Sequence, residues 1–148
     1  MPIDSATLRY LLPEMVLVLF AVLAFIGGTW NRTKLGWSTL AIMALGLAAL
    51  LLGQHGTVSS LANSGWGVVI QDPLSGGLRS ASLVLGGLLV VFSTQCPQQR
   101  LYPELLGLLV LVIVGLMLVC SAGDLVLLFV GLELISIPTY VLLLIGRD

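Results

Sequence analysis

Leu105–Ala122 (LLGLLVLVIVGLMLVCSA) and Leu125–Gly146 (LVLLFVGLELISIPTYVLLLIG) are two apolar runs separated by a Gly-Asp pair. The first run contains no charged residue, and the second contains one, Glu133. A helix of about 20 apolar residues is long enough to cross a hydrocarbon core about 30 Å thick. Each run therefore predicts a transmembrane helix.

The rest of the chain is also strongly apolar and carries few charges. Of its 148 residues, 58% are apolar and 9% are charged, whereas soluble domains carry about 25% charged residues. The net charge of −1 excludes the basic surface that nucleic-acid binding requires. No segment alternates in polarity as a β-barrel strand does, and lipid-exposed backbone must satisfy its own hydrogen bonds. The sequence therefore predicts a single-domain, all-α integral membrane protein with five transmembrane helices. The three further spans are Leu8–Gly28, Leu35–Gly53 and Leu74–Thr94.

Basic residues predict how the chain is oriented in the membrane. On one side, Arg9 stands near the first span, and Arg79 is expected to extend outward to the interface from the start of the third. The connection 54–73 lies on that side too. Because basic residues favour the cytoplasmic face, we expect the N-terminus and this loop outside and the C-terminus in the cytoplasm. The opposite side carries the larger basic group, namely Arg32, Lys34, Arg100 and Arg147.

Few residues could bind a metal or a cofactor. Cys96 and Cys120 are expected near opposite membrane faces, and the sequence has no CxxC motif or Cys/His cluster. His55, in the 54–73 connection, is expected to be solvated. We therefore expect no metal, haem or iron–sulfur site in this chain.

Glu133 is the candidate for proton transfer. It lies near the middle of the last span, where a charged side chain costs about 3 kcal/mol. Removal from water favours the protonated acid, which can then exchange protons. Ser136 and Tyr140 follow at i+3 and i+7 and form a polar stripe with it, and Pro138 frees the carbonyl of Leu134, where a kink is expected. The alternative is a protonated acid that only joins two helices.

The segment Cys120–Leu142 closely resembles subunit N of the NADH-quinone oxidoreductases, the bacterial counterpart of mitochondrial ND2. Its core, Phe129–Pro138 (FVGLELISIP), is similar to the signature of that subunit's fifth helix. Leu11–Met15 (LLPEM) resembles its first helix, and Val68–Asp72 (VVIQD) resembles the external hairpin before its third. The related subunits L and M share a Glu-then-Pro pattern in this helix and remain alternatives.

The resemblance implies an antiporter-like subunit in the membrane arm of a proton-translocating NADH:quinone oxidoreductase, in a bacterial cytoplasmic membrane. Glu133 matches the family's fifth-helix glutamate, which pairs with a lysine on a later helix. NADH, FMN, the iron–sulfur clusters and quinone are expected to bind other subunits, so this chain would hold no catalytic centre of its own. Its partners would be the other membrane-arm subunits and the lipid bilayer.

The chain departs from the family in one respect. Family members continue through further helices, which carry the lysine, whereas this sequence stops at Asp148. No Lys or Arg occupies the middle of another expected span, so a cationic partner of Glu133 would lie on another polypeptide or on a missing C-terminal part. A truncated product, half of a split subunit and a partial sequence remain open. So do a related cation/proton antiporter or energy-converting hydrogenase subunit, and a purely structural multi-span protein.

Overall fold

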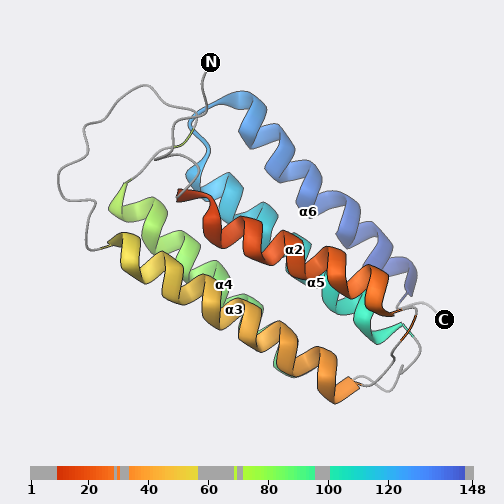
Figure 1. Cartoon of the computed structure of the whole chain (residues 1–148). Helices are drawn as coiled ribbons and strands as arrows, with labels where there is room; N and C mark the ends of the chain where they lie inside the picture. Colours follow the sequence, from red (N-terminus) through yellow and green to blue (C-terminus); the bar gives the residue numbers. More distant parts are fainter. Residues whose placement is uncertain are drawn as a thin grey trace.

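In the computed structural model the described residues, which are 10–28, 30, 34–56, 69, 72–95 and 101–145, form an all-helical bundle (Figure 1). Five helices lie within these ranges, as the sequence predicts. Four of them, α3 to α6, are long and apolar enough to cross a membrane, whereas α2 is a shorter apolar helix of 17 residues. The helices are α2 (Leu12–Gly28), α3 (Lys34–Gly56), α4 (Pro73–Ser93), α5 (Tyr102–Ser121) and α6 (Leu125–Ile145).

Helix boundaries follow from local sequence. α4 starts at Pro73, a residue that suits the first turn of a helix because its missing N–H would have no helical partner there. α5 likewise has Pro103 in its first turn, and it ends where Ala122 becomes extended. Ala122 also forms an isolated antiparallel bridge with Val69, which ties the segment before α4 to the α5–α6 connection. Most of the 54–73 connection, including nearly all of the expected hairpin, lies outside the described residues.

Four helices form a ring. α2 packs on α3, α3 on α4, α4 on α5 and α5 on α2, so that α2 and α4 occupy opposite corners. α5 is the most enclosed helix: half of its apolar membrane-spanning segment is buried inside the bundle, compared with 11% of that of α6. Figure 1 shows α6 along one flank of the bundle and α3 and α4 along the other. α6 is therefore attached to the ring mainly through α5.

Small residues let the helices approach closely. A Cβ added at Gly115 of α5 would lie 2.9 Å from the carbonyl oxygen of Gly131 on α6, so only glycine fits this crossing. On α4, Ser82 and Gly86 are both buried, and a Cβ added at Gly86 would clash with the side chain of Ile113 on α5, so these small residues allow close approach. These contacts hold α4 and α6 against α5.

Candidate functional site

The predicted polar stripe lies on the uncovered side of α6. Gly131 and Pro138 are the buried residues of this helix. Glu133 and Tyr140 each follow one of them by two positions, which is about 200° around the helix axis. Glu133 is accordingly exposed, and the Tyr140 side chain is 67% exposed. Glu133 and Tyr140 therefore point away from the helices that the structure describes, whereas Ser136 is half-buried.

Two hydroxyl groups near Glu133 bond within their own helix. The hydroxyl of Ser136, a member of the stripe, donates to the carbonyl of Leu132 at 2.9 Å, and that of Thr139, which lies beside the stripe, donates to the carbonyl of Ile135 at 2.6 Å. Such bonds satisfy hydroxyl groups in an apolar setting without a neighbouring helix. α6 continues as a helix through Pro138 to Ile145. The proposed proton-transfer role of Glu133 and the local kink remain predictions.

No cation pairs with Glu133 among the residues that the structure describes. Their single ion pair joins Glu14 to Arg79, and the nearby hydroxyls of Ser136 and Thr139 donate to backbone carbonyls of α6 rather than to the Glu133 carboxylate. Arg32, Arg100 and Arg147 lie outside the described residues. Within them, no cluster of three or more His, Cys, Asp or Glu side chains could hold a metal.

A second charged site lies inside the ring of helices. Glu14 of α2 and Arg79 of α4 form an ion pair, and their side chains are only 4% and 1% exposed. The expectation that Arg79 extends to the membrane interface is therefore wrong. α2 and α4 start at the same end of the bundle, so that two charges in their early turns lie at a similar depth. Glu14 lies at that depth, and pairing with it compensates the charge of the buried guanidinium.

Tyr10 completes this site. The Arg79 guanidinium stacks over the Tyr10 ring at 4.1 Å from its centroid, and it donates a hydrogen bond of 3.1 Å to the Tyr10 carbonyl oxygen. The Tyr10 hydroxyl also lies 3.4 Å from the Ser75 hydroxyl on α4. Arg79 is therefore held by the carboxylate of Glu14 on α2 and by the ring and the carbonyl oxygen of Tyr10, which lies just before α2. We name Glu14, Arg79 and Tyr10 the diagonal site.

The sequence does contain a signal for the diagonal site. Glu14 and Arg79 have opposite charges, and each stands near the start of a span that enters from the same side. Two such residues are expected to pair because an isolated charge in an apolar bundle is costly. What the sequence could not indicate is that α2 and α4 occupy opposite corners of the ring, so that the pair crosses its interior.

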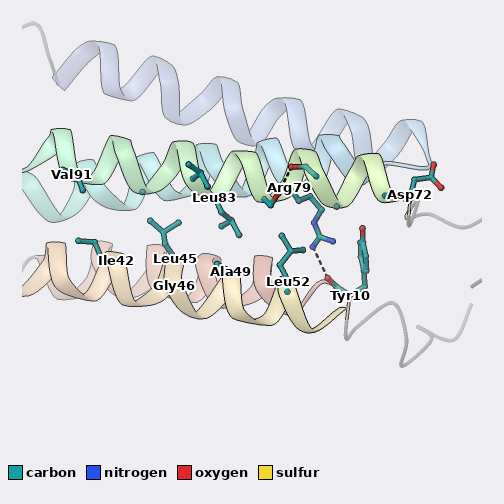
Figure 2. Close-up of a pocket in the computed structure, with 17 residues that line it drawn as sticks. Tyr10, Ile42, Leu45, Gly46, Ala49, Leu52, Asp72, Arg79, Leu83 and Val91 are labelled. Atoms are coloured by element: carbon teal, nitrogen blue, oxygen red, sulfur yellow. Dashed lines mark hydrogen bonds between the residues drawn. The ribbon is translucent and has the colours of Figure 1, made fainter. Parts of the chain in front are cut away.

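Two grooves flank the diagonal site. One, of about 940 Å³, runs between α3 and α4, with Tyr10, Asp72 and Arg79 toward one end and apolar side chains along its length (Figure 2). The other, of about 560 Å³, lies between α2 and the α5–α6 pair and contains Glu14 and Leu134. Arg79 thus faces one groove, and Glu14 faces the other.

Comparisons with known proteins identify relatives over nearly the whole chain. No family model matches it. Proteins named NADH-quinone oxidoreductase subunit N are similar to it: that of Jannaschia sp. (strain CCS1) is 31% identical, covering 97% of this chain and 30% of the relative. The proteins of Trichlorobacter lovleyi and Rhodobacter capsulatus are each 32% identical, covering 98% and 97% of this chain. The chain spans about 30% of the length of these relatives.

Proposed function

Because the chain is homologous to the N-terminal part of NADH-quinone oxidoreductase subunit N, we propose that it works in the membrane arm of such a complex. There it contributes to proton translocation driven by electron transfer from NADH to quinone. FMN, iron–sulfur clusters and quinone bind other subunits of that complex. The helical bundle with its apolar spans supports a place within the membrane.

The observation that carries this proposal is the position of Glu133. An ionisable group on an otherwise apolar span costs about 3 kcal/mol in lipid, and within this chain no described helix covers it. Such groups mark ion or proton pathways when they face a partner or a wet cavity. We propose that the exposed stripe of α6 faces protein and that Glu133 transfers protons there.

A basic residue, most simply a lysine, is the proposed partner of Glu133. It would be supplied by protein beyond these 148 residues, because the relatives are about three times as long as the part that this chain matches. A cation opposite Glu133 would neutralise it in the resting state. Proton transfer would then accompany the separation of the two charges.

Membership of the complex is tested by native electrophoresis of detergent-solubilised membranes, with the chain tagged at its N-terminus. The tag is expected to comigrate with a large complex that oxidises NADH in the gel. A denaturing second dimension then reports the size of the tagged polypeptide. A tag that migrates alone, or with a complex that lacks NADH oxidation, would contradict the proposal. The second result would favour an antiporter or hydrogenase assembly.

A further inference from the structure

We propose that the groove between α3 and α4 is a docking surface for a transmembrane helix of a neighbouring subunit. This inference rests on the proposed function, because it names a contact through which the chain joins the assembly proposed above. α3 and α4 lie along the flank of the bundle opposite α6 (Figure 1). The groove is therefore separate from the side of α6 on which Glu133 is exposed.

The glycines of this groove have no role in the packing of the described helices. Of the eleven glycines whose surroundings the structure describes, six have a close neighbour in the bundle, because a Cβ added there would lie 3.3 Å or less from another residue. At the other five, an added Cβ would meet no described atom within 4 Å. All five line the groove, and they are Gly46, Gly53, Gly76, Gly77 and Gly87. Each of them lowers the stability of its helix relative to alanine, so contacts within the bundle do not explain them.

The dimensions and lining of the groove fit a helix. Gly76 and Val91, which both line it, are 15 residues apart on α4, or about 22 Å, and the hydrocarbon core is about 30 Å thick. The buried side chains of Leu45 and Leu83 make it apolar. Membrane helices approach one another closely where their surfaces carry small residues, whereas a fluid acyl chain fits around side chains of any size. Small residues on both α3 and α4 therefore favour a helix over a lipid.

Arg79 gives a second, independent indication of an occupant. Its side chain is 1% exposed and lines the groove, and Figure 2 shows it directed into the space between α4 and α3. Its Nε atom is buried and has no hydrogen-bond partner among the described residues. A buried donor without an acceptor is costly. We therefore expect the docked helix to bring an acceptor to this end of the groove, such as the Ser, Thr, Asn or Gln side chains that bond between membrane helices.

The longer relatives indicate that this helix comes from a neighbouring subunit. They are about three times as long as the part that this chain matches, and that part is their N-terminal one. Their further residues thus follow the segment that corresponds to α6. α6 is attached mainly through α5, on the flank opposite the groove. Helices that follow α6 are placed to cover its exposed side, which leaves the α3–α4 groove for another polypeptide.

The first test is native electrophoresis of solubilised host membranes that contain the tagged chain with everything that assembles with it. Ala49→Leu introduces a larger side chain into the groove from α3. Its matched control, Ala81→Leu, makes the same change at an exposed position of α4 that does not line the groove. We expect Ala49→Leu to lower the fraction of tagged chain that comigrates with the large complex by about tenfold. Ala81→Leu should leave this fraction unchanged.

A smaller change keeps the test decisive if Ala49→Leu does not accumulate in the membrane. Gly87→Ala adds one methyl group, which has room in the described bundle but would meet a docked helix. It should also lower the comigrating fraction. A fraction equal to that of Ala81→Leu would overturn the proposal.

Photocrosslinking in the purified complex identifies the occupant. A benzophenone side chain introduced at Ala49 should give a tagged product that is larger by the mass of one other subunit, whereas the same side chain at Ala81 should give none. A lipid adduct alone, a product of two tagged chains, or no larger product from Ala49 would overturn the proposal.

Staining the native gel for NADH oxidation separates this failure from that of the proposed function. If the unmodified chain comigrates with a complex that does not oxidise NADH, the proposed function fails. The effect of Ala49→Leu on that complex then still decides whether the groove is a docking surface.

Discussion

Glu14 and Arg79, 65 residues apart in the sequence, form an ion pair across the diagonal of a four-helix ring. Their helices occupy opposite corners, and both pack on α3 and α5. The pair is therefore a direct polar link between two helices that are otherwise joined chiefly through their neighbours. Because both side chains are buried, removal of one charge should destabilise the other, and this coupling can be measured.

Removal of one charge of the pair is expected to destabilise the bundle. Arg79→Gln leaves the Glu14 carboxylate buried without its cation, and breaking a buried pair in this way costs about 3 kcal/mol or more. Heating the purified chain in detergent and following the loss of helical circular dichroism measures the effect. The double variant Glu14→Gln/Arg79→Gln removes both charges and should regain most of the lost stability. A double variant as unstable as Arg79→Gln would show that the stability of the bundle does not depend on this ion pair.

The crossing of α5 and α6 is expected to tolerate no side chain at Gly115. An added Cβ would lie 2.8 Å from Cγ1 of Ile135 and 2.9 Å from the backbone oxygen of Gly131, so Gly115→Ala should destabilise the chain by about 1–3 kcal/mol. Gly87→Ala is the control, because a Cβ there meets no described atom within 4 Å. It should be neutral or stabilising by about 0.5 kcal/mol. The same thermal unfolding experiment compares them, and equal midpoints would contradict the close crossing.

The orientation predicted from the basic residues can be tested by cysteine labelling. Asp124 lies at the end of the bundle where α4 starts, and Thr94 lies just beyond the other end of α4; both are exposed. In a background with Cys96 and Cys120 replaced by serine, Asp124→Cys should react with a membrane-impermeant maleimide in intact cells. Thr94→Cys should react only in inverted vesicles. The reverse pattern would place the N-terminus in the cytoplasm.

Much of the fold was predictable because apolar run length determines which segments cross a bilayer. Leu105–Ala122 and Leu125–Gly146 correspond to α5 and α6, and the all-helical class with five helices is confirmed. Helix pairing was harder to predict, because apolar spans carry almost no pattern that distinguishes one neighbour from another. Only the structure therefore shows that α2 to α5 form a ring and that α6 lies outside it.

The candidate sites show the same limit. Glu133 was recognisable because a lone acid in an apolar run is costly whatever surrounds it. For Arg79 the surroundings decide: at the start of a span the side chain can reach the interface or pair inside the bundle. The sequence favoured the interface. In the structure, Glu14 on a distant helix forms an ion pair with Arg79 and keeps its side chain inside the bundle. Interactions between spans are thus what the sequence alone did not predict.

One comparison decides whether Glu133 transfers protons: NADH-driven proton uptake per NADH oxidised in inverted vesicles, for Glu133→Gln and Glu133→Asp beside the unmodified chain. Since a positioned acid–base group contributes about 100-fold or more to a proton transfer, the path through this chain should stop in Glu133→Gln. The complex should still assemble and oxidise NADH, and Glu133→Asp, which keeps the carboxylate, should retain part of the uptake. Full proton uptake by an assembled Glu133→Gln complex would contradict the proposed role.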